Sequence, residues 1–180
     1  MIIFNNIAFR TIEKTDLEEI RQEHNRESTL LNLGDPSLVT ELQQNSWWES
    51  ISRNKNNTVF GIVQLKTNKL IGVWRLQNLD TINRTVEVGI DIFEKYQGKG
   101  YGKMGYQMIF KYLFENYNIH TIFLRVGEFN AKAISLYKKV GFKETGKITE
   151  SIYRHGKYWD NIIMCITSND YFSSQKVKAK

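Results

Sequence analysis

A glycine-rich segment separates two stretches whose apolar residues repeat with different periods; it reads Gln97-Gly98-Lys99-Gly100-Tyr101-Gly102-Lys103. Residues 85–93 alternate between apolar and polar side chains, which is typical of a strand with one buried face. Residues 101–117 repeat apolar side chains at helical spacing, and a further short strand is expected over 121–126. A strand, a loop, a helix and a second strand in this order indicate a mixed sheet covered by helices.

Further strands and helices are expected on both sides of this centre. Thr15-Asp16-Leu17-Glu18 has the form of a capping box and predicts a helix through about His24. Gly141 is a typical terminating residue for a helix over 130–140. The remaining expected elements are strands over 7–12, 58–65, 70–76, 142–153 and 158–167, and a helix that starts at Asp35-Pro36-Ser37 after a loop over 25–34.

The composition supports one domain with a sizeable core. The chain has 180 residues, of which 41% are apolar and 13% aromatic, and one domain commonly contains ~100–200 residues. We expect a single domain over residues 1–170 and a frayed, polar and basic tail over 171–180. No apolar run approaches the ~18 residues of a membrane-spanning helix, and no signal peptide is recognised. Cys165 is the single cysteine, which excludes a disulfide framework and fits a reducing, cytoplasmic compartment.

The chain is basic, with a formal net charge of +6. Three of these charges can be assigned to Lys176, Lys178 and Lys180 in the expected tail. A basic surface can bind nucleic acid, an anionic membrane or a small polyanion. The sequence has no Lys/Arg-rich stripe with interleaved aromatic residues, so neither nucleic acid nor a membrane is expected as a partner.

The glycine segment has the chemistry of an anion-binding loop. Glycines allow a tight turn and let a ligand approach the backbone amides closely. Free N–H groups at the start of a helix attract an anion, and Lys99 and Lys103 add positive side chains. A phosphate or pyrophosphate is the ligand that this arrangement favours, and an ordinary glycine-rich turn is the alternative. The spacing matches neither a Walker A loop nor a dinucleotide-binding loop.

A second pattern follows at 130–142, where Asn130 and Tyr137 lie two turns apart on one face of the expected helix. Two motifs therefore stand on the expected elements: Gln97-x-x-Gly100-x-Gly102 and Asn130-x-x-Ala133-x-x-x-Tyr137-x-x-x-Gly141-Phe142. Together they resemble the motifs of the GNAT N-acetyltransferases, and the order of elements matches that family over nearly the whole chain. The resemblance implies an α/β (α+β) fold with a mixed, mostly antiparallel seven-stranded sheet, a central splayed parallel pair and about four flanking helices.

The same resemblance implies acetyl-CoA as co-substrate, lying between the splayed strands 85–93 and 121–126. It puts the pantetheine arm beside the backbone of Ile90, Asp91 and Ile92. The residues expected to hold the pyrophosphate are Gln97, Gly98, Lys99, Gly100, Tyr101, Gly102 and Lys103. Asn130 would bond the pantetheine arm, with Lys132 nearby. The alternatives are that Asn130 only caps its helix and that Lys132 is a solvated surface charge.

Acyl transfer from a thioester to an amine requires a neutral nucleophile and a protonated thiolate leaving group. The resemblance assigns the second task to Tyr137, because a phenol can donate a proton to sulfur; a core aromatic is the alternative. Glu87 stands where several family members carry a strand glutamate that removes the amine proton, through water. Its alternative is an ion pair with a Lys or Arg of a neighbouring strand. No metal is expected, because the three histidines lack metal-ligand spacing: His24, His120 and His155.

The acceptor amine is expected opposite the CoA arm, near the 25–34 loop, the second helix and the final hairpin. Candidate acceptor-binding residues are Glu23, Arg26, Trp47, Trp48, Trp74 and Tyr153. Adjacent Trp47 and Trp48 cannot share a helix face, so at least one is expected in the core. The closing segment 154–160 resembles the branch that acetylates ribosomal-protein N-termini, polyamines and amino sugars. This resemblance slightly favours a peptide α-amine, and the loop 25–28 with the Trp47-Trp48 helix would equally suit a sugar nucleotide. For a polyamine, Glu18, Glu19 and Glu23 supply only a partial set of carboxylates.

An inactive CoA-binding regulatory module would share the fold and the glycine loop. The presence of Tyr137 and Glu87 argues against this alternative. Related enzymes are often homodimers, and the aromatic terminal hairpin could supply such an interface.

Overall fold

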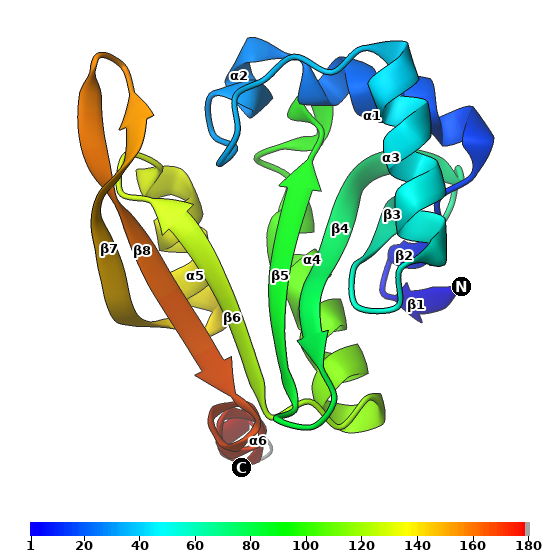
Figure 1. The fold of residues 1–180 in the computed structure, drawn as a ribbon. Helices are drawn as coiled ribbons and strands as arrows, with labels where there is room; N and C mark the ends of the chain where they lie inside the picture. The colour runs from blue at the N-terminus through cyan, green and yellow to red at the C-terminus, as the bar shows by residue number, and fades with distance from the viewer. Residues whose placement is uncertain (179–180) are drawn as a thin grey trace.

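One sheet of eight strands runs through the computed structural model, which describes residues 1–178 (Figure 1). Its order is β1-β2-β3-β4-β5-β6-β8-β7, and all neighbours are antiparallel except β5 and β6. The strands are β1 Ile2–Phe4, β2 Ile7–Thr11, β3 Thr58–Gln64, β4 Lys69–Asp80, β5 Thr85–Ile92, β6 Thr121–Gly127, β7 Lys143–Arg154 and β8 Lys157–Thr167. The mixed, mostly antiparallel sheet with one parallel pair confirms the expected fold class.

The eighth strand, β1, was not expected from the sequence. It pairs with β2 from Ile2↔Phe9 to Phe4↔Ile7 across the turn Asn5-Asn6. Asn5 has a positive φ of 54°, a conformation that asparagine tolerates better than most residues. Two asparagines between two apolar runs were therefore the available signal for this hairpin.

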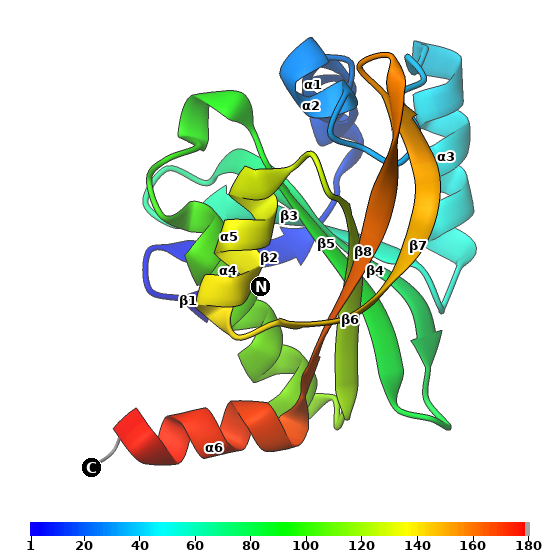
Figure 2. The same ribbon diagram turned by 90° about the vertical axis from the view of Figure 1, so that its left-hand side faces the viewer.

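Helices cover both faces of the sheet (Figure 2). The helices are α1 Leu17–His24, α2 Glu27–Leu30, α3 Glu41–Arg53, α4 Tyr101–Phe110, α5 Ala131–Val140 and α6 Ser168–Lys178. α4 and α5 lie on one face and α3 on the other, while α1 and α2 lie at one end of the molecule. A π-helical turn over Lys111–Asn116 extends α4, and a 3₁₀ turn over Glu94–Tyr96 follows β5. Within residues 1–178, none of the helices has both the length and the apolar character required to cross a membrane.

The helix that was expected to start at Asp35 is α3, and its expected start is wrong. Asp35 closes a local turn, because its Oδ1 accepts a hydrogen bond from the backbone N–H of Ser37 (2.9 Å). α3 begins only after Thr40, whose hydroxyl and backbone N–H form a capping box with Gln43. Leu38 and Leu42 share the spacing of a helical apolar face, but they are 66% and 77% exposed and do not pack in the core.

The parallel pair is splayed, as expected. β5 and β6 pair only from Thr85↔Thr121 to Glu87↔Phe123. Beyond this vertex β5 continues along β4 and β6 continues along β8, so the two strands diverge (Figure 1). The sheet thus forms two arms, one built from β1 to β5 and the other from β6, β8 and β7.

The main core contains α4 and takes buried residues from strands of both arms, including β6 and β8. Val86 and Val88 of β5 pack in it, which confirms the expected apolar face of this strand. Trp74 of β4 is fully buried there and stacks between Phe9 and Phe60, with ring centroids 4.7 and 4.9 Å away. The expectation that Trp74 contacts the acceptor is therefore wrong.

The end of the chain forms a helix, so the expectation of a frayed tail from residue 171 is wrong for residues up to 178. Thr167 and Asp170 form a capping box for α6: each backbone N–H donates to the other's side chain, at 3.1 and 3.2 Å. Tyr171 is buried against Phe110 and Phe114, and its hydroxyl donates to Glu115 (2.6 Å). Residues 179–180 lie outside the described part of the chain.

Candidate active site

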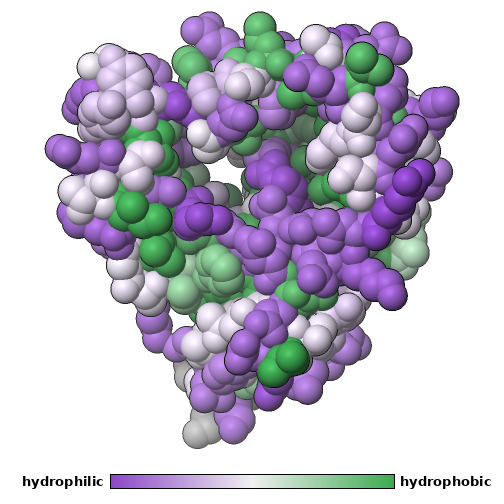
Figure 3. Space-filling view, in the orientation of Figure 1, coloured by the Kyte–Doolittle hydropathy of each residue, from purple (hydrophilic) through white to green (hydrophobic). Residues whose placement is uncertain are grey.

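The divergence of β5 and β6 opens a cleft of about 1550 Å³ between the two arms. Figure 3 shows its opening, with hydrophilic residues along much of the rim. One half of the cleft is lined by the glycine loop, the start of α4 and α5, and the other half by α1, the segment after α2, and α3. The C-terminal half of β5 lies between the two halves, so a ligand in either half contacts this strand.

The glycine loop has the backbone geometry of an anion site. Gly98 and Gly100 have φ values of +74° and +83°, which favour glycine. A side chain at either position would meet no atom within 4 Å, so the backbone faces open space. Gly100 is the N-cap of α4, and the first helical bond runs from the Met104 N–H to the Gly100 carbonyl (3.1 Å). The preceding amides are left for a ligand, which fits a pyrophosphate.

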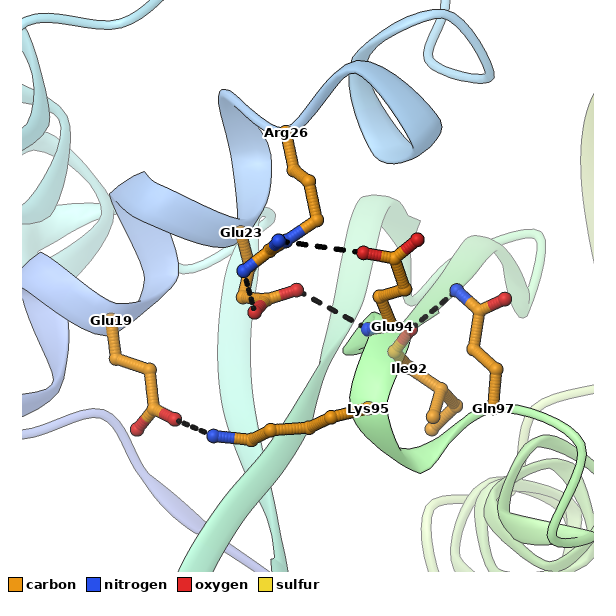
Figure 4. Close-up of polar contacts among 7 residues, drawn as sticks. All are labelled: Glu19, Glu23, Arg26, Ile92, Glu94, Lys95 and Gln97. Carbon is orange, nitrogen blue, oxygen red and sulfur yellow. Dashed lines mark hydrogen bonds and ion pairs between the residues drawn. The ribbon is translucent and has the colours of Figure 1, made fainter.

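Some side chains in and beside the glycine loop line the cleft, and others bond to neighbouring backbone. Lys103 and Lys132 line the cleft. Gln97 joins the end of β5 to α5, because its Nε2 donates to the Ile92 carbonyl (3.0 Å) and its Oε1 accepts from Lys132 (2.8 Å). Figure 4 shows the first of these contacts. Lys99 instead donates to the Lys95 carbonyl (2.9 Å) and is not among the described residues that line the cleft.

Tyr101 and Gly102 also line the cleft but have structural contacts of their own. The Tyr101 hydroxyl accepts a hydrogen bond from Gln64 (3.2 Å). A Cβ on Gly102 would lie 3.0 Å from Leu136 Cδ2, so this glycine also lets α4 and α5 approach each other.

The free edge of β5 and the start of α5 face the same half of the cleft. Ile90, Asp91 and Ile92 line it, and their strand has no β6 partner beyond Glu87 among the described residues. Asn130 lines it too, and its Oδ1 accepts from the Ala133 N–H (3.1 Å). Asn130 is therefore a helix cap, the alternative named above, at a position that a pantetheine arm could reach.

Tyr137 lies in the cleft close enough to Asp91 of β5 and Arg75 of β4 to be affected by their charges. It comes from α5, lines the cleft, and packs edge-on against Tyr106 of α4, with ring centroids 5.6 Å apart. Burial, the largest effect, raises the pKa of the Tyr137 phenol, and the charge of Asp91 raises it too. The Tyr106 hydroxyl and the charge of Arg75 lower it, but the net shift is upward. The phenol is therefore protonated at neutral pH and can act as a proton donor.

Both carboxylates on the polar face of β5 are paired with arginines. Asp91 forms an ion pair with Arg75 of β4, and both residues line the cleft. Glu87 is 9% exposed and accepts from Arg125 Nε and Nη2 (2.9 and 2.8 Å) and from Asn78 Nδ2 (3.0 Å). The ion-pair alternative for Glu87 is thus the one observed.

The other half of the cleft contains a shared arginine. Glu23 is buried on α1 and accepts from Arg26 (3.1 Å) and from the backbone N–H of Glu94 (3.2 Å). Arg26 also lies 3.4 Å from the Glu94 carboxylate, and it is half-exposed (Figure 4). Glu23, Trp47 and Glu94 line the cleft. Trp47 and Trp48 both pack against the small core under α1 and α3, and of the two only Trp47 also lines the cleft.

Two residues of the terminal hairpin differ from expectation. Tyr153 is 56% exposed, packs edge-on against Tyr158 and is not among the described residues that line the cleft. Arg154, which was not singled out, is buried and donates to the carbonyls of Leu33 (2.7 Å) and Gly34 (3.0 Å). It therefore joins the hairpin of one arm to the loop that follows α2 on the other. Nothing local in the sequence marked this contact, which spans more than a hundred residues.

Comparisons with known proteins agree with this architecture. The profile of the acetyltransferase (GNAT) domain matches residues 6–143. Spermidine N(1)-acetyltransferase of Escherichia coli K12 is 25% identical over 172 residues, which cover 96% of this chain and 91% of that protein. An N-alpha-acetyltransferase of Sulfurisphaera tokodaii is 35% identical over 88 residues, covering 47% of this chain and 52% of that protein. The crystal structure of Vibrio cholerae spermidine N-acetyltransferase with CoA and spermine has a TM-score of 0.87 and 26% identity, covering 94% of this chain and 99% of that one.

Proposed function

The chain belongs to the GNAT acetyltransferases and is an acetyl-CoA-dependent N-acetyltransferase; on this premise we propose that its acceptor is a primary amine of a polyamine such as spermidine. The relatives that match nearly the full length of the chain support this acceptor class. It differs from the slight preference for a peptide α-amine drawn from the closing segment.

The half of the cleft lined by α1, the segment after α2, and α3 is called the acceptor half. The charged groups of this half carry the proposal. Glu23 and Glu94 share Arg26. Hydrogen bonds from Ser37 lower the pKa of Asp35 most, and the nearby charge of Arg154 lowers it further. These three carboxylates outnumber by one the two guanidinium groups beside them. A negative potential at a cleft concentrates a polycation and steers its approach. A neutral sugar or a short uncharged peptide would gain less from it.

The CoA half is proposed to hold the co-substrate through the glycine loop, Lys103, Lys132 and the free edge of β5. The amine nitrogen attacks the thioester carbonyl, and its proton passes to solvent in the cleft. When the carbon–sulfur bond breaks, Tyr137 gives its proton to the sulfur. Tyr137 is suited to this role because its phenol lines the cleft, packs against Tyr106 and keeps its proton at neutral pH.

A role of Glu87 as general base receives little support from its surroundings. Its carboxylate already accepts three hydrogen bonds, two from the Arg125 guanidinium and one from Asn78, so few of its acceptor positions are left for an amine. We propose instead that Glu87 and Arg125 hold the vertex of the two arms.

An acceptor screen monitored by CoA release tests the proposal. Spermidine, a short peptide with a free N-terminus and an amino sugar are compared at equal concentration, while calorimetry measures acetyl-CoA binding. Faster turnover with spermidine is expected. Turnover with the peptide alone would replace the acceptor class, and binding of acetyl-CoA without turnover of any amine would favour an inactive CoA-binding regulatory module.

Self-association through the terminal hairpin is also proposed. β7 is an edge strand and almost entirely exposed, and the hairpin presents Tyr153 and Tyr158 to solvent. Light scattering during size-exclusion chromatography should therefore report a mass above the 21.2 kDa of one chain.

A further inference from the structure

Tyr106 carries a buried hydroxyl that the fold does not use. Its side chain, on α4, is fully buried, and its Oη has no hydrogen-bond partner among the described residues. A buried polar atom without a partner destabilises a folded protein, and such atoms are rare. Tyr106 nevertheless lines the cleft. A phenylalanine would fill the same space without burying an unpaired hydroxyl. The presence of the hydroxyl therefore indicates a functional role.

The position of Tyr106 indicates what this function is. Its ring stands edge-on to Tyr137, with centroids 5.6 Å apart and an interplanar angle of 84°. Phe142 packs against both rings, at 5.5 and 6.0 Å, and holds the pair in place. Tyr137 is thus accompanied in the cleft by a second phenol from a different helix.

We propose that Tyr106 is a positioning residue for proton transfer, whose hydroxyl donates a hydrogen bond to Tyr137 Oη as that oxygen becomes negative. The inference rests on the proposed role of Tyr137 as proton donor. In the step, the O–H bond of Tyr137 breaks, an S–H bond of CoA forms, and the negative charge moves from sulfur to the phenolate oxygen. Tyr106 keeps its own proton, and Tyr137 regains one from the proton that the amine released to solvent.

The surrounding charges agree with this division of roles. Burial raises the pKa of both phenols, and it raises that of Tyr106 well above the ordinary value, so Tyr106 remains protonated when Tyr137 ionises. The other charged groups that act on Tyr137 are Asp91 of β5, which raises its pKa, and Arg75 of β4, which lowers it. Asp91 and Arg75 carry opposite charges and are paired with each other. Tyr106 is the neutral hydroxyl among the groups that act on Tyr137.

The variant Tyr106→Phe tests the inference, with Tyr112→Phe as matched control. Tyr112 lies in the turn that extends α4 and lines a separate hollow beside β1. Tyr106→Phe should lower kcat about tenfold or more, since a donor aimed at a developing charge has effects of this size. The KM for acetyl-CoA should stay the same and the melting temperature should not fall. The alkaline limb of the kcat–pH profile should move to higher pH. Tyr112→Phe should leave kcat and the profile unchanged.

A double-variant cycle separates this inference from the proposed role of Tyr137. Tyr106→Phe combined with Tyr137→Phe should be no slower than Tyr137→Phe alone, because the hydrogen bond serves only that oxygen. If Tyr137→Phe is slow while Tyr106→Phe has the normal kcat and pH profile, the role of Tyr106 is overturned and that of Tyr137 stands. If Tyr137→Phe keeps full turnover, the proposed proton donor fails and the role of Tyr106 fails with it.

Discussion

Glu87 of β5 and Arg125 of β6 are joined by two hydrogen bonds, Nε–Oε1 at 2.9 Å and Nη2–Oε2 at 2.8 Å, at the point where the paired strands begin to separate. The last residue pair of the parallel ladder is Glu87↔Phe123, so the ion pair lies immediately at the vertex of the cleft. A side-chain contact at this point limits how far the two arms can move apart.

Glu87→Gln should therefore affect stability more than chemistry. Arg125 would lose a charged partner, and we expect about 1–2 kcal/mol lower stability to urea unfolding. The value of kcat should stay within about tenfold of the original, and the acidic limb of its pH profile should remain, because a lost general base typically costs ~10²–10⁴-fold. Arg125→Met is the matched variant and should show the same pattern. Loss of the acidic limb in Glu87→Gln alone would restore the general-base role.

Lys103 and Lys99 flank the same glycines, yet only Lys103 lines the cleft. Lys103→Met should weaken acetyl-CoA binding about fivefold or more, which corresponds to ~1 kcal/mol, and the loss should shrink as salt is added. Lys99→Met should change the affinity by less than about twofold. Isothermal titration calorimetry of both variants gives the comparison. Equal losses would mean that the ammonium group of Lys99 leaves Lys95 to reach the ligand.

The proposed attraction of a polyamine to the carboxylates of the acceptor half can be tested at Glu94, whose side chain shares Arg26 with Glu23. Glu94→Gln removes one negative charge from this half of the cleft, so the KM for spermidine should rise about fivefold, or ~1 kcal/mol. Acetyl-CoA affinity should not change. Glu49→Gln, an exposed position on α3 outside the described lining, serves as the control for net charge. An unchanged KM in Glu94→Gln would argue against electrostatic recognition of a polyamine.

The parts of the site that were predicted correctly are those with a local cause. Gly98 and Gly100 adopt positive φ values and Gly141 ends α5 because each conformation depends on the residue itself. The helical spacing of Asn130 and Tyr137 likewise follows from 3.6 residues per turn. These features fix the glycine loop and the face of α5 that meets it.

The errors concern side chains whose surroundings come from distant parts of the chain. Alternation assigns Trp74 to one face of a strand, but only pairing with β3 and packing with Phe9 show that this face is a closed core. The partner of Glu87 lies 38 residues away, and the carbonyl partners of Arg154 lie 121 and 120 residues away. α6 is different, because Thr167-Ser168-Asn169-Asp170 contains a capping box that the sequence displayed and the basic composition of the tail obscured.

That capping box gives a stability test with a defined pH dependence. Hydrogen bonds from Lys143 and from Thr167 lower the pKa of Asp170 to about 2, from an ordinary 3.8. A carboxyl group whose pKa is lower in the folded state stabilises the fold above its unfolded pKa, and this contribution disappears as the pH falls toward the folded value. Asp170→Asn should therefore be about 1 kcal/mol less stable than the original chain near pH 7, a magnitude typical of a lost helix cap.

The difference should narrow below about pH 4 and disappear only below pH 2, because Asp170 of the folded original chain is still about half-ionised at its pKa of about 2. Urea unfolding at a series of pH values measures this gap, and Glu144→Gln, on the exposed edge of β7, controls for the loss of one charge. High salt should reduce only part of the gap, since it screens the exposed ammonium group of Lys143 but not the two contacts with Thr167. A gap that persists unchanged to pH 2 would mean that the asparagine disrupts α6 by its shape, and that the charge of Asp170 does not stabilise the helix.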